Sequence, residues 1–235
     1  MNSFSCVITG HRPTRFKFKY NEKDKRCQRI KKCLQEQLIR LYNQGVRCFW
    51  AGGAMGADMW AAEILLRMKE QQAYQDVELC LALPFEGYDS DWDDWHRKRM
   101  DFIRRYAEKV LILCETPSSE SYKKRNYYMV EQAGYMIAVY DNAHNMRSGT
   151  QQAVNYAKKK GLQIIYIHPD TAQVSCSSFN VERSRPSTMT LPEVGTSSPP
   201  IMFSSVDLPL PEVPTIATNS PCSTERFTPS RAFVP

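Results

Sequence analysis

Short runs of consecutive apolar residues recur along the first part of the chain and alternate with stretches in which apolar residues return every three or four positions. A continuous apolar run rich in β-branched and aromatic residues is typical of a strand that is buried on both faces. A spacing of three and four is typical of a helix with one apolar face. The runs predict strands at residues 5–9, 47–51, 77–83, 109–114, 135–140 and 163–168.

Helical patterns separate the predicted strands. Repeated alternation of strand and helix indicates parallel strands joined by right-handed crossovers, with helices on both faces of the sheet. We therefore predict an α/β fold, Rossmann-like and doubly wound, with a mainly parallel sheet of about six strands. The predicted helices are one with Ile30, Leu34, Leu38 and Leu41 on its apolar face, then 59–69, a helix capped by Ser90 that ends near Tyr106, 123–134 with Gly134 at its end, and 150–160 before Gly161.

The composition changes abruptly after Asp170. Residues 171–235 are dominated by Ser, Thr and Pro, and their apolar residues are scattered singly. Such a segment cannot bury enough apolar surface to offset the entropy lost on ordering. We therefore predict a Rossmann-like domain over residues 1–170 and a disordered tail over residues 171–235. Short apolar pieces at 201–203 and 206–208 are either docking sites or parts of a simple tail, which the composition favours.

The charge pattern is mildly basic, with a formal net charge of +6 over 235 residues. Its dense basic stretches are residues 17–32 and 158–160, and charge runs of this kind usually form solvated helix faces. Phe16, Phe18 and Tyr20 lie beside the first stretch, and aromatic rings stack on the bases of single-stranded nucleic acid. The sequence favours a solvated surface and leaves nucleic-acid binding as an alternative.

The cysteines indicate neither a metal site nor a disulfide framework. Cys6, Cys48, Cys80 and Cys114 fall within apolar runs, where thiols behave as small apolar side chains. No CxxC pair occurs among the eight cysteines, which disfavours a zinc or redox motif. No stretch approaches the roughly 18 apolar residues of a membrane helix, and no signal-peptide pattern is present. We expect a cytoplasmic protein with no metal site and no membrane partner.

Two glycine-bearing turns, at residues 51–58 and 147–150, each follow an apolar run and each open a helical pattern. Glycine tolerates positive φ and lets the backbone approach a ligand closely, while the first turn of a helix offers N–H groups without an intrahelical partner. The helix dipole adds partial positive charge at the same place. This arrangement predicts a site for a nucleotide-like ligand that carries phosphate.

Ligands of such sheets bind at the carboxyl ends of the strands, near the point where the strand order reverses. The guanidinium of Arg12 suits bidentate phosphate binding, and a loop histidine such as His11 is more often a hydrogen-bonded structural residue than a catalyst. The segments that follow strand ends supply the predicted ligand-binding residues Thr9, Gly10, His11, Arg12, Gly52, Gly53, Gly56, Ala57, Asp58, Pro84, Asp141, Ser148, Gly149 and Thr150.

Four charged or apolar side chains have two interpretations each. Asp58 either stabilises the start of its helix or binds ribose hydroxyls or a ligand amine. Glu63 is either a surface residue or an acid or base. Arg125 and Met129 share one helical face, so they either flank a flat ring of the ligand or divide into a rim charge and a core residue. The sequence leaves each pair of alternatives open.

Several separated segments, spread over residues 4–169, together carry a family resemblance. They are 9–13, 52–58 with Ala62 and Glu63, Pro84 with Phe85, Arg125 and Asn126 with Met129 and Val130, 138–141, and 148–150. These segments are similar to the YpsA-like branch of the SLOG (SMF/DprA and LOG) superfamily. The resemblance implies a Rossmann-like domain that binds a nucleotide or a nucleotide-derived ligand, and relatives that often pair as homodimers.

The superfamily includes phosphoribohydrolases, DNA-processing proteins that hold single strands, and sensor domains for NAD-derived signals. The phosphoribohydrolases carry a PGGxGTxxE motif, and Ala153 stands here in place of its glutamate. Alanine cannot act as an acid or base, or stabilise an oxocarbenium-like centre. The resemblance therefore favours binding or sensing of a nucleotide-type ligand over cleavage of an N-glycosidic bond. Asp58, Glu63 and Arg125 remain as catalytic candidates, and no further cofactor is assigned.

Overall fold

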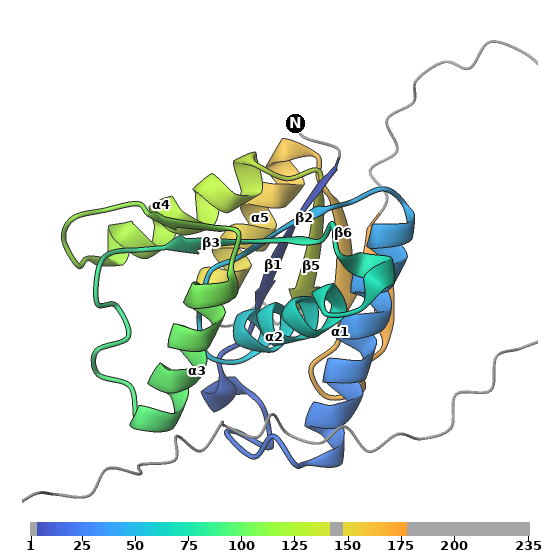
Figure 1. Ribbon diagram of the computed structural model, residues 1–235, viewed down its shortest axis with the longest axis horizontal. Helices are drawn as coiled ribbons and strands as arrows, with labels where there is room; N and C mark the ends of the chain where they lie inside the picture. Colours follow the sequence, from blue (N-terminus) through green and yellow to red (C-terminus); the bar gives the residue numbers. More distant parts are fainter. Residues whose placement is uncertain (1–3, 142–147, 178–235) are drawn as a thin grey trace, which may run out of the picture. The chain divides into compact units, whose positions relative to one another are not determined.

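The computed structural model describes residues 4–141 and 148–177. Its strands form one sheet in the order β4-β3-β2-β1-β5-β6-β7 (Figure 1). Neighbouring strands are parallel, except that β7 runs antiparallel to β6. The predicted α/β fold with a mainly parallel sheet is confirmed. The strands are β1 (Ser5–Gly10), β2 (Cys48–Ala51), β3 (Glu78–Leu83), β4 (Lys109–Ile112), β5 (Tyr135–Val139), β6 (Gln163–Ile167) and β7 (Val174–Ser177).

Helices cover both faces of this sheet. Side chains of α1, α2 and α3 share one buried cluster with one face, and side chains of α4 and α5 share a second cluster with the other face. The chain builds outward from β1 to β4 and then returns to place β5 on the other side of β1, so the strand order reverses between β1 and β5. The helices are α1 (Lys25–Asn43), α2 (Ala57–Lys69), α3 (Asp94–Tyr106), α4 (Ser119–Glu131) and α5 (Gly149–Lys160), with short 3-10 turns at Pro13–Arg15 and Gln72–Tyr74.

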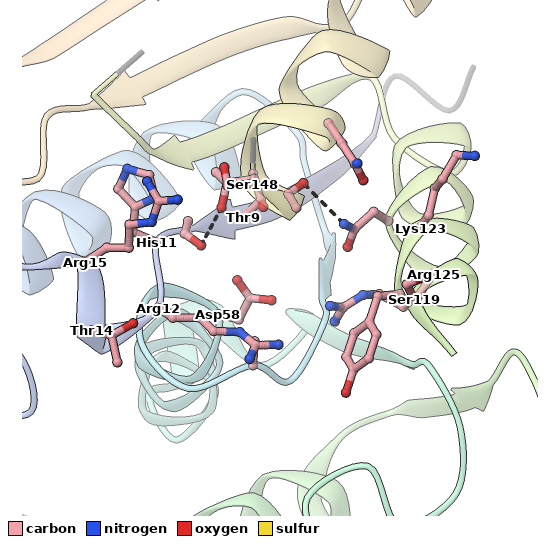
Figure 2. Close-up of a pocket in the computed structure, with 17 residues that line it drawn as sticks. Thr9, His11, Arg12, Thr14, Arg15, Asp58, Ser119, Lys123, Arg125 and Ser148 are labelled. Carbon is pink, nitrogen blue, oxygen red and sulfur yellow. Dashed lines mark hydrogen bonds between the residues drawn. The ribbon is translucent and has the colours of Figure 1, made fainter. Parts of the chain in front are cut away.

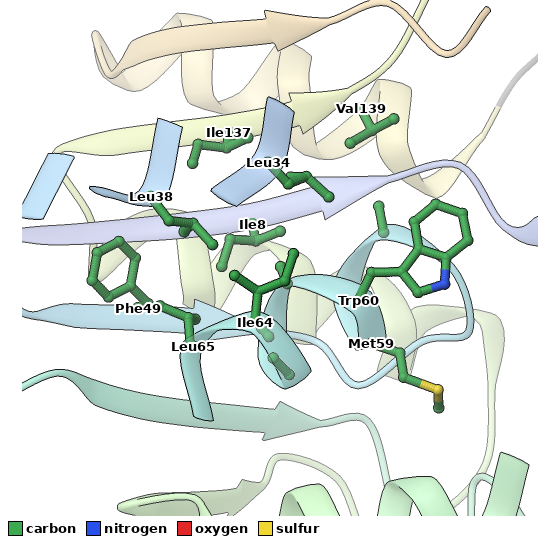
Figure 3. Close-up of a cluster of buried hydrophobic side chains, with 14 of the residues drawn as sticks. Ile8, Leu34, Leu38, Phe49, Met59, Trp60, Ile64, Leu65, Ile137 and Val139 are labelled. Carbon is green, nitrogen blue, oxygen red and sulfur yellow. The ribbon is translucent and has the colours of Figure 1, made fainter. Parts of the chain in front are cut away.

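The larger core cluster lies between β1, β2 and β5 and the helices α1 and α2. Figure 3 shows Ile8 of β1 surrounded by Leu34 of α1 and Phe49 of β2. Trp60 of α2 is fully buried in this cluster. Leu34 lies on the apolar face that the spacing of three and four predicted, and Ile8 and Phe49 lie in the apolar runs that predicted strands, so the sequence pattern and the packing of the core agree.

Phe16 and Phe18 belong to the same core and are not free to stack on bases. Their rings are 4.9 Å apart and nearly parallel, and they lie 5.3 and 6.2 Å from the ring of Trp60. Both side chains are buried. The aromatic residues that suggested contact with single-stranded nucleic acid therefore anchor the segment after β1 onto α2, and only Tyr20 is exposed.

Three helix ends differ from the predicted ones by three residues or more, and one of them is the C-terminus of α4, which ends at Glu131 with Gln132 as its C-cap and not at Gly134. The N-cap of α3 is Asp93 and not Ser90, because the Asp93 carboxylate accepts hydrogen bonds from the N–H groups of Trp95 and His96 at 3.1 Å each. The helix α4 begins at Ser119, four residues before the predicted start at 123, because the Ser118 hydroxyl caps it. By contrast, α5 ends where predicted, with Gly161 in the left-handed conformation at φ +74°.

The sheet continues into the segment that the composition predicted to be disordered. Residues 174–177 form β7, which pairs with β6 so that Ile164 lies opposite Ser177 and Ile167 opposite Val174. The boundary at 170 was therefore too early, because backbone pairing to a buried neighbour can order a polar strand of low apolar content. The prediction for residues 178–235 lies outside the described residues.

No described helix could cross a membrane. The longest of them, α1, has 19 residues, but its apolar side chains occupy one face and charged side chains the other.

The carboxyl end of β1 passes very close to the start of α2. A Cβ atom on Gly10 would overlap the Cβ of Ala57 and lie 3.0 Å from the Cβ of Val139. Both of those atoms are fixed by their own backbones, so neither can move aside. The missing side chain at Gly10 therefore allows β1 to lie between β5 and α2.

We expect the substitution Gly10→Ala to lower the free energy of unfolding by about 2 kcal/mol or more, because the added methyl group overpacks a rigid contact. Urea unfolding followed by circular dichroism measures this. Gly149→Ala is the matched control, since its added Cβ would meet Asn126 Nδ2 at an ordinary 3.5 Å. Equal unfolding midpoints for Gly10→Ala and the wild type would contradict the expectation.

Candidate functional site

A cavity of about 430 Å³ opens at the carboxyl ends of the strands, beside the reversal of strand order. Its walls come from the segment after β1, the loop before α2, the first turns of α4 and the start of α5 (Figure 2). Segments far apart in the sequence thus meet at one edge, as the fold predicted. The predicted residues that line the cavity are Thr9, Gly10, His11, Arg12, Asp58, Arg125, Ser148, Gly149 and Thr150.

The start of α5 forms one wall and is held by its neighbours. The Ser148 hydroxyl caps the helix by accepting a hydrogen bond from the Gln151 N–H at 3.1 Å. The Thr150 hydroxyl donates to the carbonyl of Gly10 at 2.8 Å, and Asn126 Nδ2 of α4 donates to the carbonyl of Gly149 at 3.3 Å. The first turn of α5, whose N–H groups have no intrahelical partner, is therefore fixed against both β1 and α4 at the cavity wall.

His11 is buried and hydrogen-bonded. Its Nε2 lies 3.1 Å from Oδ1 of Asp141, and its ring packs edge-on against Tyr140, with ring centroids 5.3 Å apart. Its backbone N–H donates to the carbonyl of Val139 at 3.1 Å. These contacts fix the turn after β1 and fit a structural role for His11. Asp141 contacts His11, which lines the cavity, but does not line the cavity itself.

Gly52 lies between two charged side chains of opposite sign. Its N–H donates to Asp58 Oδ2 at 3.1 Å, and its carbonyl accepts a hydrogen bond from Nη1 of Arg125. A Cβ atom at this position would overlap the Arg125 guanidinium and lie 2.8 Å from the Asp58 carboxylate. Only glycine permits this approach, so the turn after β2 is built around the two side chains.

Burial acts on both of these charged groups. It raises the pKa of Asp58, and the nearby charge of Arg125 and the N–H of Gly52 oppose that rise. It lowers the pKa of Arg125, and the charge of Asp58 opposes that fall. The guanidinium stays charged because its ordinary pKa is so high. Arg125 Nε has no hydrogen-bond partner among the described residues, which leaves a buried cation with unused hydrogen-bonding capacity.

The cavity has an excess of positive charge. Arg12, Arg15, Lys123 and Arg125 line it, and Asp58 supplies the carboxylate among the described lining residues. The positive end of the α5 dipole adds to this excess. Arg12 also lies over the ring of Tyr122, 5.9 Å from its centroid. The site is therefore suited electrostatically to an anionic ligand.

Glu63 does not line the cavity. Arg99 Nε of α3 donates to its Oε1 at 2.6 Å. Arg99 Nη1 also donates to Glu22 Oε1 at 2.8 Å, and Glu22 accepts the indole N–H of Trp60 at 2.9 Å as well. This network ties α2 and α3 to the segment after β1, which carries Arg12 and Arg15. The sequence left Glu63 open as a surface residue or as an acid or base, and the structure places it in this ionic network.

The other predicted residues support the cavity from behind. Gly53 is at φ +66° and accepts a hydrogen bond from Tyr88 Oη at 2.9 Å, and Gly56 is at φ +96° beside the carbonyl of His11. Met129 is buried in the second core cluster, so the core interpretation holds for it, whereas Arg125 is buried and is no rim charge. Gly52, Gly53, Gly56, Ala57, Pro84, Met129 and Asp141 are outside the cavity lining.

Position 153 faces the core. Ala153 is buried in the second cluster with Met129 and Val130, whereas its neighbour Gln152 lines the cavity. Ala153, which stands for the missing glutamate, therefore packs among apolar side chains, and its neighbour Gln152 presents an uncharged amide to the cavity.

The sequence reasoning missed several lining residues. Four of them lie on α4 at spacings of three and four, which places them on one helix face, and that spacing was the available signal. Thr14 and Arg15 lie on the 3-10 turn after Pro13, where no periodicity exists to find them. The missed residues are Thr14, Arg15, Ala54, Ser119, Tyr122, Lys123, Asn126 and Gln152. The described residues contain no group of His, Cys, Asp and Glu arranged to hold a metal.

Comparison with known proteins identifies the family. The family model YpsA, described as the YspA SLOG family, matches residues 6–172. The chain belongs to the YspA SLOG family. The match spans every element from β1 to β6 and so includes all the segments that line the cavity.

The names of two similar relatives state no activity. A UPF0398 protein of Bacillus cereus is 30% identical over 158 residues, which is 66% of this chain and 83% of that protein. A UPF0398 protein of Bacillus thuringiensis (strain Al Hakam) is 29% identical over the same shares of the two chains.

Two solved structures of DNA processing protein A are also similar. That of Streptococcus pneumoniae is 17% identical with a TM-score of 0.45, covering 70% of this chain and 50% of that one. That of Helicobacter pylori, whose title describes a single-stranded DNA binding mode, is 15% identical with a TM-score of 0.46, covering 69% and 64%.

We expect the ionic contacts of Glu22 with Arg99 and Lys31 to make the free energy of unfolding sensitive to acid. Burial alone would raise the pKa of Glu22, but the hydrogen bonds and charge of Arg99, together with Lys31, lower it to about 2. A carboxylate with a lowered pKa contributes stability above its unfolded-state pKa and loses that contribution as the pH falls toward the folded-state value. Glu22→Gln should therefore lower the free energy of unfolding by roughly 3 kcal/mol at pH 7.

The difference in the free energy of unfolding between Glu22→Gln and the wild type should shrink as the pH falls from 5 to 3. Thermal unfolding across that pH range measures it. Glu36→Gln is the control, because Glu36 is an exposed residue of α1. A difference that stays constant across the range would contradict the role given to Glu22.

Proposed function

We propose that the cavity binds a nucleotide or nucleotide-derived small molecule through its phosphate. The observation that carries the proposal is the gathering of Arg12, Arg15, Lys123 and Arg125 around the start of α5, with Asp58 as the opposing carboxylate among the described lining residues. A helix N-terminus flanked by guanidinium groups provides both unpaired N–H donors and positive charge, which a phosphate requires.

The phosphate would rest at the first turn of α5. Gly149 and Thr150 offer backbone N–H groups there, and no side chain at Gly149 stands between the ligand and the helix. Arg12 approaches from the opposite wall and is exposed, so it can reorient without disturbing the core. A cavity of about 430 Å³ lies within the range of small-molecule sites.

The remaining part of the ligand would lie toward α4. The ring of Tyr122 faces the cavity beside Arg12, so Tyr122, and not Met129, would lie against the flat ring of a base. Asp58 accepts hydrogen bonds from the backbone N–H groups of Gly52 and Ala54, and because a carboxylate has about four acceptor sites it can still accept hydrogen bonds from ribose hydroxyls. Arg125 beneath them supplies positive charge, and its Nε has no hydrogen-bond partner among the described residues.

We expect Arg12→Ala to weaken nucleotide binding by about tenfold or more, because it removes a charge-assisted hydrogen bond to phosphate. Isothermal titration of AMP, ADP and ADP-ribose into the purified protein measures the dissociation constants, and native mass spectrometry identifies any small molecule that co-purifies. Arg40→Ala is the control, because Arg40 is exposed on α1 and does not line the cavity.

Absence of saturable binding for all three compounds, together with no co-purifying small molecule, would overturn the proposal. Retention of single-stranded oligonucleotides that weakens with salt, without nucleotide binding, would instead favour the nucleic-acid alternative, because phosphate contacts release counterions.

Cleavage of an N-glycosidic bond is the second candidate function, and Asp58 is the observation that favours it. Its carboxyl group lines the cavity and is buried, and burial raises its pKa toward the range of a general acid. Against this, the carboxylate already holds the Gly52 N–H. A second carboxylate, which glycosidic cleavage ordinarily uses, is missing from the described lining residues.

We expect no release of free base when the protein is incubated at high concentration with AMP, ADP-ribose or NAD, as followed by liquid chromatography. The reason is the single carboxylate in the described lining. Base release that is lost in Asp58→Asn and kept in Glu63→Gln would make the protein a hydrolase and would assign the role to Asp58.

A further inference from the structure

Most of the exposed large apolar side chains in the described part of the chain lie on two adjacent elements. Trp95, Phe102 and Tyr106 are exposed on α3, and Val110 and Ile112 are exposed on β4. The rings of Phe102 and Tyr106 lie 4.7 Å apart. A concentration of this kind within one short stretch of a surface marks an interaction site more often than scattered single residues do.

The strand β4 is also an edge of the sheet. It pairs with β3, and among the described residues no strand pairs with its outer side. An edge strand with apolar side chains presents unpaired backbone groups to another strand. The other edge is different, because β7 has the sequence Val-Ser-Cys-Ser and is mostly polar.

Exposed apolar side chains of α3 and β4 share one face of the sheet. Val110 lies opposite Leu81 and Ile112 opposite Leu83 in the pairing of β4 with β3. Leu81 and Leu83 belong to the core cluster that contains Met100 and Ile103 of α3. Val110 and Ile112 therefore point to the side of the sheet that α3 covers, so the edge and the helix form one surface.

We propose that this α3–β4 surface binds a second copy of the same chain, with the two β4 strands paired antiparallel across a twofold axis. The segment Lys109-Val-Leu-Ile-Leu-Cys-Glu115 begins with the four residues of β4, and its Leu113 N–H continues the pairing with β3 by donating to the Leu83 carbonyl at 3.0 Å. This segment is complementary to itself in that arrangement. With the axis at Ile112, Lys109 of one copy lies opposite Glu115 of the other, Val110 opposite Cys114, and Leu111 opposite Leu113. Opposite charges at both ends and apolar pairs between them fit this register.

The twofold arrangement also accounts for the aromatic residues of α3. Phe102 and Tyr106 would lie beside the joined strands in both copies, on the face that Val110 and Ile112 share with α3. A twofold interface places the same surface on both partners, so each apolar side chain exposed in one copy would be covered by the other. The surface is separate from the cavity, and the proposal does not depend on the ligand.

The test is the oligomeric state of the full chain, measured by sedimentation velocity over a range of about 1 to 200 μM. We expect a dimer that dissociates on dilution. Val110→Glu should raise the dissociation constant by at least tenfold, because it brings a charge into the apolar contact. Val174→Glu is the matched control, since Val110 and Val174 are both 39% exposed and both lie on edge strands.

Charge reversal tests the register. Lys109→Glu alone places two carboxylates opposite each other and should weaken the dimer by about tenfold, since like charges that face each other are destabilising. Adding Glu115→Lys to Lys109→Glu restores opposite charges and should restore the dimer. Far-ultraviolet circular dichroism and the unfolding midpoint of each variant show whether its fold is intact.

Several results would overturn the proposal. One is a monomer at every concentration. Another is a dimer that Val174→Glu weakens as much as Val110→Glu does. A third is a dimer that responds to Val110→Glu but in which the double reversal fails to restore what Lys109→Glu removes, which would reject the proposed register.

Discussion

The burial of the Arg125 guanidinium beneath the glycine turn after β2 is the constraint around which the cavity is arranged. A buried cation is costly unless it is paired and hydrogen-bonded, and here the Gly52 carbonyl and the charge of Asp58 compensate it. This requires glycine at 52, an acid in the first turn of α2, and a position of α4 that brings Arg125 across β2. The three elements are thereby fixed relative to one another at the site.

The walls of the cavity are held by contacts that reach into the core. Phe16 and Phe18 pack against Trp60, and the Trp60 indole and Arg99 both donate to Glu22. The segment that carries Arg12 and Arg15 is thus anchored at its far end by a network of apolar and ionic contacts. Contacts of this kind preorganise the cavity wall, which would lower the entropy cost of binding the proposed ligand.

The fold could be read from the sequence because it follows from local periodicity. Apolar runs predicted the six parallel strands, and Gly161 predicted the end of α5. Both signals depend on neighbouring residues alone. The site was predicted in part, since the carboxyl ends of parallel strands meet in any fold of this class. The ionic contact of Glu63 could not be foreseen because its partner Arg99 lies 36 positions away, and β7 was missed because its order comes from pairing with β6. Neither the contact of Glu63 with Arg99 nor the pairing of β7 with β6 can be predicted from a local sequence pattern.

Gly10 and Ala57 lie so close together that a larger side chain at either position would enter the space of the other. Any side chain at 10 would force β1 away from α2, and because Gly10 also accepts the Thr150 hydroxyl, that movement would pull the floor of the cavity away from the start of α5. The pair is therefore a marker that can be read in any member of the family. A small residue at both positions indicates a chain that keeps the same cavity, and a bulky residue at either indicates one whose cavity has a different floor.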